Sequence, residues 1–181
     1  MKKILLLACI GIMMMAASGQ AMAESKPIQL SLTPDIAVFG RHTEIKGLAL
    51  SIWGENPQKA LAIGFVNGST GSSAGFSLGL VNYADSYTGV QWALANYTKG
   101  SFVGWQSSIV SYTEGAFTGL QSGFFNYAGN LTGLQLGFVN YAAKVTKGVQ
   151  IGLVNLMPQN RWFTGFPKEL APGMVIVNWR F

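Results

Sequence analysis

One nine-residue unit dominates the sequence and occurs three times in succession, as Gly119-Leu-Gln-Ser-Gly-Phe-Phe-Asn-Tyr127, Gly133-Leu-Gln-Leu-Gly-Phe-Val-Asn-Tyr141 and Gly148-Val-Gln-Ile-Gly-Leu-Val-Asn-Leu156. Copies with substitutions begin at residues 47, 60, 75, 89 and 104, so successive copies start 13 to 15 residues apart. Helical repeats need about 30 residues or more, so each copy is a single short element followed by a turn.

Side chains alternate within each copy. Leu134, Leu136, Phe138 and Asn140 would share one side of a strand, whereas Gly133, Gln135, Gly137, Val139 and Tyr141 would share the other. Such alternation, with many Val, Phe, Tyr and Trp residues, is typical of β-strands. A helix would carry two glycines per copy at a cost of about 1 kcal/mol each. The sequence therefore predicts an all-β protein.

The linkers favour antiparallel hairpins. If neighbouring strands pair with like faces together, the turns centre on Thr70-Gly71, Lys99-Gly100 and Glu114-Gly115. Tight hairpins prefer glycine at the second turn position, where φ must be positive. We therefore predict an up-and-down antiparallel β-barrel of 8–10 strands built from 14–15-residue repeats. The alternative is a parallel β-solenoid, in which the leucines would form the core.

The strands carry no charge, and this favours a membrane. Every Asp, Glu, Lys and Arg between residues 47 and 156 lies in a linker, and a cation at mid-depth in a bilayer costs about 2–4 kcal/mol. The chain ends with alternating Val175, Val177, Trp179 and a terminal Phe181, which resembles the last strand of outer-membrane barrels. Added strands around residues 28–39 and 173–181 give ten, an even number that suits a closed barrel.

The N-terminus has the features of an export signal. Lys2 and Lys3 precede an apolar segment over residues 4–17, and Ala21-Met22-Ala23 offers a small-x-small cleavage site. We expect a signal peptide over residues 1–23 and one repeat-built domain over 24–181. Leu6-Leu7-Ala8-Cys9 leaves a lipoprotein signal as the alternative.

Composition excludes several classes of protein. Only 10% of residues are charged, which is far below the roughly 25% of ordinary soluble domains. Together with the single cysteine and the lack of a long apolar run past the N-terminus, this argues against disorder, a coiled coil, a helical membrane bundle and a disulfide scaffold. The formal net charge of +5 is too small to indicate a nucleic-acid partner.

The repeat and the closing Val177-Asn178-Trp179-Arg180-Phe181 resemble a family of uncharacterised, exported "surface repeat" proteins of Gram-negative bacteria. The resemblance covers roughly residues 47–181 and is most specific over residues 119–156. The family has no established catalytic residues, so the resemblance implies none here.

Two groups of residues are candidate sites. Five of the eight copies carry a glutamine at the third position, and this row would line the barrel lumen, either as a polar path or as a filler of mutually hydrogen-bonded amides: Gln91, Gln106, Gln121, Gln135 and Gln150. The longest linker, residues 157–172, is the candidate contact loop because long exposed loops often carry function, although it could instead plug one end; its residues of interest are Arg161, Trp162, Phe163, Phe166 and Lys168.

The sequence predicts no enzyme, metal site or cofactor. His42 is the single histidine and no nucleophile motif accompanies it. The predicted function is therefore a small outer-membrane barrel with a structural or surface-interaction role. Its expected partners are outer-membrane lipids and the barrel-assembly machinery, with an unknown surface ligand. The alternative is an exported, soluble or surface-attached β-solenoid binding module, periplasmic or extracellular, that binds through its glutamine and asparagine rows.

Overall fold

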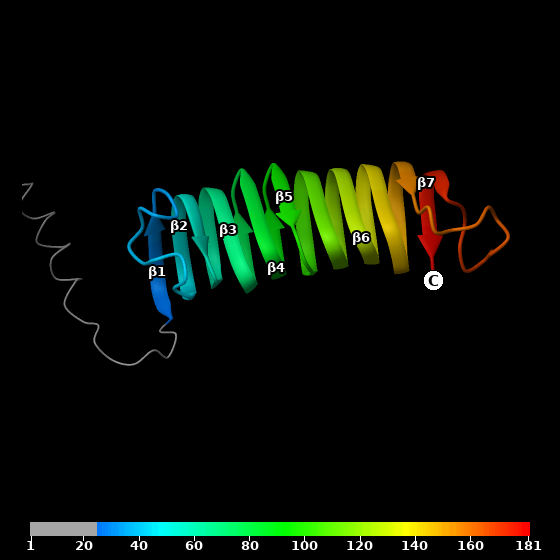
Figure 1. Cartoon of the computed structure of the whole chain (residues 1–181). Helices are drawn as coiled ribbons and strands as arrows, with labels where there is room; N and C mark the ends of the chain where they lie inside the picture. Colours follow the sequence, from blue (N-terminus) through cyan, green and yellow to red (C-terminus); the bar gives the residue numbers. More distant parts are fainter. Residues whose placement is uncertain (1–24) are drawn as a thin grey trace, which may run out of the picture.

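A computed structural model describes residues 25–181 as an elongated stack of coils, shown in Figure 1. The predicted signal peptide and the alternative lipoprotein cysteine lie outside the described residues. The strands follow chain order: β1 (Lys26–Ser31), β2 (Ile45–Asn56), β3 (Lys59–Leu78), β4 (Val81–Trp92), β5 (Ala95–Thr98), β6 (Phe102–Leu156) and β7 (Gly173–Arg180). The longest strand, β6, runs through several coils without interruption.

Neighbouring coils pair in parallel, with each residue beside its equivalent one repeat later. Leu48 pairs with Leu61 and Gly75 pairs with Gly89, so the register equals the repeat length. The final strand is the exception, because β7 pairs antiparallel with the end of β6, Gln150 opposite Asn178. The protein is an all-β parallel solenoid built from repeats of about 14 residues.

The predicted antiparallel barrel, with its transmembrane strands and outer-membrane-barrel function, is therefore wrong. A hairpin would need positive φ at the second turn glycine, and Gly71 has it (62°). Gly100 and Gly115 do not; positive φ falls instead on the first residue of the repeats, such as Gly104 (129°) and Gly119 (128°). These linkers bend a coil onward in one rotational sense and do not reverse the chain.

Polar ladders explain why the parallel register is preferred. The Gln106 Nε2 donates to Gln91 Oε1 at 3.1 Å, and Gln135 Nε2 donates to Gln121 Oε1 at 2.7 Å. Asparagines stack likewise, with Asn140 Nδ2 donating to Asn155 Oδ1 at 2.8 Å. Each buried amide finds a donor and an acceptor in its own kind only when equivalent residues lie directly above one another.

Aromatic and small side chains complete the core. Tyr87, Phe102 and Phe117 are buried and stacked, with centroids 6.1 and 5.4 Å apart. Alanines and threonines that follow the tyrosines, such as Ala128 and Thr113, are also buried. The interior is thus a narrow strip of polar and aromatic ladders.

The predicted division of each strand into two sides is correct only for its first half. Gln135 points inward and Phe138 is exposed, as a two-residue period requires, but Asn140 is buried. A corner at Phe138-Val139 turns two consecutive side chains outward, which shifts the alternation by one residue. The solenoid alternative expected the leucines to form the core. They lie instead on the outer surface of the solenoid.

Both ends of the stack are covered by loops, drawn in light blue and in orange to red in Figure 1. Residues 32–39 fold back over β1, where Val38 N donates to Leu30 O at 3.0 Å. The N-terminal strand predicted over residues 28–39 accordingly ends at Ser31. At the other end, Leu170 N donates to Trp179 O at 3.2 Å and Phe181 N to Lys168 O at 2.8 Å, so residues 168–170 pair with the free side of β7.

Candidate functional site: an apolar sheet face

The second, fourth and sixth residues of the repeats form one outer side of the solenoid, called here the apolar face. Its sixth-position side chains are all exposed and apolar: Ile52, Phe65, Leu80, Leu94, Ile109, Phe124, Phe138 and Leu153. Phe138, for example, is 48% exposed. The face contains no charged residue.

The apolar face is large. A strand spacing of about 4.8 Å and a rise of about 3.3 Å per residue make it about 34 Å long and 17 Å wide. Monomeric soluble proteins rarely expose a contiguous apolar patch beyond a few hundred Å². A face of roughly 570 Å² on this estimate lies at the upper end of the range for the largest patch of an ordinary monomer, so it is the candidate interaction site.

Hollows interrupt the face; a smaller one, of about 450 Å³, lies between Leu50, Phe65 and Leu80, and two are larger. One, of about 650 Å³, lies beside β1 and the N-terminal loop and is lined by Leu30, Leu32, Ile36, Val38, Leu50 and Ile52. The other, of about 610 Å³, lies where Ser107 replaces a large side chain between Trp92 and Phe124. Trp92 and Trp105 meet edge to face near this second hollow, with centroids 5.0 Å apart.

A ladder of tyrosines follows the apolar face around the corner, at the ninth position of the repeats. Tyr97, Tyr112, Tyr127 and Tyr141 stack with centroids 5.8, 4.3 and 5.4 Å apart. Tyr83 leads this row and donates its hydroxyl to Glu55, and burial together with that hydrogen bond raises the pKa of Tyr83 to about 12. The Tyr83 phenol is therefore neutral at physiological pH.

The glutamine row lines no lumen, because the fold is not a barrel. Gln91, Gln106, Gln121, Gln135 and Gln150 are all 0% exposed inside the solenoid. The asparagine row is buried as well, with Asn126, Asn140 and Asn155 at 3% exposure or less. Neither row can contact a partner, so the alternative in which these ladders bind a polymer fails on burial.

The contact loop covers the C-terminal end of the stack. Trp162, Phe163 and Phe166 are more than half exposed on it, and Lys168 is also exposed. Arg161 turns back toward the chain and donates from Nε to Glu169 Oε1 at 3.0 Å. The loop both covers the end and presents aromatic rings, while its role as a contact site stays a prediction.

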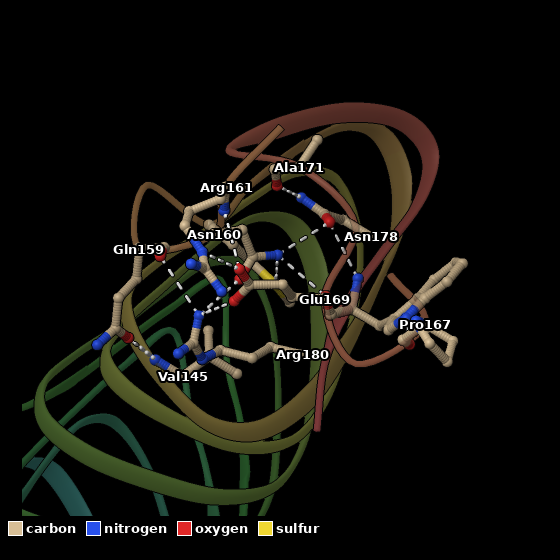
Figure 2. Close-up of polar contacts among 11 residues, drawn as sticks. Val145, Gln159, Asn160, Arg161, Pro167, Glu169, Ala171, Asn178 and Arg180 are labelled. Atoms are coloured by element: carbon tan, nitrogen blue, oxygen red, sulfur yellow. Dashed lines mark hydrogen bonds and ion pairs between the residues drawn. The ribbon is translucent and has the colours of Figure 1, made fainter. Parts of the chain in front are cut away.

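The inner side of this loop holds a polar cluster centred on Glu169, shown in Figure 2. Its carboxylate accepts from Arg161 and from Arg180 of β7. Asn178 Nδ2 donates to Ala171 O at 2.8 Å, and Asn160 Nδ2 donates to Trp179 O at 3.0 Å. The Arg161 hydrogen bond, helped by the Arg180 charge, holds the pKa of Glu169 below its ordinary value. These bonds fix the loop on β7, so the role of the cluster is structural.

Within residues 25–181 no group of three or more His, Cys, Asp or Glu side chains could hold a metal ion. His42 lies in the N-terminal loop, in a turn. No helix in this part of the chain is long and apolar enough to cross a membrane.

Comparison with known proteins returned no match: no family model fits the chain, and no curated protein or solved structure is similar to it. The resemblance to surface-repeat proteins therefore stays a prediction.

The apolar face is a site that the residue pattern indicated but did not identify. The alternation predicts an uncharged side of leucines and phenylalanines, but it suits lipid outside a barrel or a solenoid core as well as an exposed sheet face. The signal that could have separated these possibilities is the glutamine at position three, because a buried ladder of amides needs the parallel register.

Proposed function

We propose that this chain is an exported β-solenoid binding module that docks onto an apolar partner surface through its apolar face. The observation that carries the proposal is the exposure of all eight sixth-position side chains on one uncharged side. At about 25 cal/mol per Å², covering roughly 570 Å² gains on the order of 10 kcal/mol. That gain is comparable with the roughly 4–15 kcal/mol lost on association, so a partner with apolar area of its own would bind stably.

Two further observations support the proposal. Both ends of the stack are covered by loops, which leaves the long sides as the available surfaces. The N-terminal sequence pattern favours export, and residues 25–181 contain no cysteine, as suits an oxidising compartment.

Cysteine labelling in cells tests the proposal. In a Cys9→Ala background, Phe138→Cys places a thiol on the apolar face, and Lys144→Cys places a matched control thiol on an exposed linker residue outside it. We expect a water-soluble maleimide to label Phe138→Cys at least tenfold more slowly than Lys144→Cys in cells, while both label fully after unfolding in urea. Equal labelling rates in cells would show that nothing covers the face, and the proposal would fail.

A further inference from the structure

The apolar face has few hydrogen-bond donors or acceptors that a partner would need to satisfy. Its side chains are hydrocarbon apart from tryptophan Nε1 groups and the hydroxyls of Ser107 and Ser122. Trp105 Nε1 already donates to Ser122 Oγ at 3.0 Å. The strands beneath pair along the stack, so their backbone groups are satisfied by neighbouring coils. An occupant without donors or acceptors can therefore cover this face at little cost.

The two long borders of the face carry the side chains that membrane interfaces favour. On one border, Lys46, Lys59 and Lys147 directly precede their repeats and are exposed. On the other border lies the tyrosine ladder, and tyrosine rings are enriched at the headgroup level of bilayers. Glu44 pairs with Lys46 at 3.1 Å and with Lys59 at 3.5 Å, so these three groups together keep one net positive charge. The tyrosine border also carries two carboxylates, because Tyr83 donates its hydroxyl proton to Glu55 and Tyr97 donates to Glu114. The lysine border is therefore the one that complements anionic headgroups, while the tyrosines suit the interfacial layer.

The uneven shape of the face favours a fluid occupant over a rigid one. The hollows of about 650 and 610 Å³ differ in lining and lie at unequal places along the stack. A rigid partner fills such hollows only where its own side chains project at matching places, and empty space at an interface forfeits contact energy. Acyl chains can enter hollows of any shape.

We propose that the occupant of the apolar face is the surface of a lipid bilayer, on which the solenoid lies flat without crossing it. The leucines and phenylalanines enter the outer part of one leaflet, while the lysine border contacts anionic headgroups and the tyrosine ladder lies at headgroup depth. This inference rests on the proposed function and names its partner.

Flotation with vesicles tests the inference. Purified residues 24–181 are mixed with phosphatidylcholine vesicles with and without phosphatidylglycerol, and the floating fraction is measured. We expect the wild type to float, and Phe138→Asp and Leu153→Asp each to lower binding at least tenfold. Ala116→Asp makes the same charge change at an exposed residue outside the face and should float like the wild type. Circular dichroism confirms that each variant is folded.

A separate variant tests the contribution of the lysine border. Juxtamembrane lysines contribute about 1 kcal/mol each near an anionic surface, which is about fivefold in binding. Lys147→Gln should therefore weaken binding about fivefold on phosphatidylglycerol vesicles and leave binding to pure phosphatidylcholine unchanged.

Two results would overturn the inference. One is a folded wild type that stays in the aqueous fraction with both vesicles; the other is equal flotation of wild type and Phe138→Asp. If the wild type does not float but sediments as a dimer that Phe138→Asp dissociates, a second copy covers the face. In that case the lipid inference fails while the proposed function stands. Failure of the function itself is shown separately, by equal labelling of the two cysteines in cells.

Discussion

At the scale of single residues, the glycine that opens most of the repeats decides whether the coil can form. Gly119 has φ of 128°, and a Cβ there would lie 2.0 Å from the carbonyl oxygen of Gly104. The neighbouring coil therefore occupies the space that a side chain would take, and the left-handed backbone conformation disfavours any L-residue as well.

Gly119→Ala should lower the free energy of unfolding by about 3 kcal/mol or more, because strain and a backbone collision add. Gly40→Ala is the control, since a Cβ at Gly40 meets nothing within 4 Å. Urea denaturation followed by circular dichroism measures both. Similar midpoints for the two variants would contradict the role given to Gly119.

At the scale of the element, the side-chain ladders set the register, and one natural fault shows how. Asparagines occupy the eighth position on both sides of the repeat that starts at Gly104, but Ser111 stands there in between. Its hydroxyl lies 2.6 Å from that of Ser108, which replaces a usual glycine at the fifth position. Beyond the fault, Asn126 Oδ1 has no partner among the described residues. The serine pair thus substitutes locally for a glycine–asparagine pair.

Restoring the ladder should need both changes together. In the repeat that starts at Gly133, a Cβ at Gly137 would lie 2.9 Å from Asn140 Oδ1, so Ser108 would crowd an asparagine at position 111. We expect Ser111→Asn alone to destabilise by about 1–3 kcal/mol. Adding Ser108→Gly should recover that loss, because the introduced amide could then donate to Asn126 Oδ1.

A double-mutant cycle in urea denaturation measures this coupling, with an expected interaction energy of at least about 1 kcal/mol. Additive effects of the two changes would mean that position 108 does not limit position 111. The ladder would then continue through the fault without a glycine.

The sequence predicted the strands and the repeat length because both depend on local patterns. The alternation around Gln135 and the glycines repeated every 13 to 15 residues are visible in the chain itself. The pairing partner was not predictable from the same local chemistry, because Glu114-Gly115 suits a hairpin and a coil corner alike. The corner at Phe138-Val139 was missed for a related reason: two adjacent apolar residues look the same whether the strand continues or bends. For the candidate site, residue type located the apolar positions but not the side of the sheet that they occupy.

At the scale of the whole molecule, the covered ends keep a stack of identical strands finite. Unpaired strand edges template further pairing, and a parallel in-register stack is especially prone to it. The Glu169 cluster holds the C-terminal loop on β7, through Arg161 and Arg180. The loop should therefore loosen when this carboxylate loses its charge.

The pH dependence of stability tests that role. The pKa of Glu169 is lowered in the folded state from an ordinary 4.5, so its stabilising contribution is complete above that value. The contribution is lost as the pH falls through the lower, folded-state pKa. Glu169→Gln should be less stable than the wild type at neutral pH, and this difference should shrink as the solution is acidified below 4.5.

Asp35→Asn provides the control, because the Asp35–Arg41 ion pair is exposed and surface pairs contribute little. Its difference from the wild type should be small at every pH. If the stability difference between Glu169→Gln and the wild type is equally large above and below pH 4.5, the Glu169 charge does not hold the loop. The uncharged hydrogen bonds of Asn160 and Asn178 would then hold it.

The repeat-by-repeat contact pattern also bears on how such a chain can evolve. Each coil touches only the coil before and the coil after it, so duplicating or deleting one copy between residues 104 and 148 disturbs two junctions and leaves both end loops intact. Every added copy would lengthen the apolar face by about 4.8 Å at constant width. Unequal crossing-over within the gene could therefore adjust the avidity of the protein in uniform steps, without any new fold or new contact chemistry.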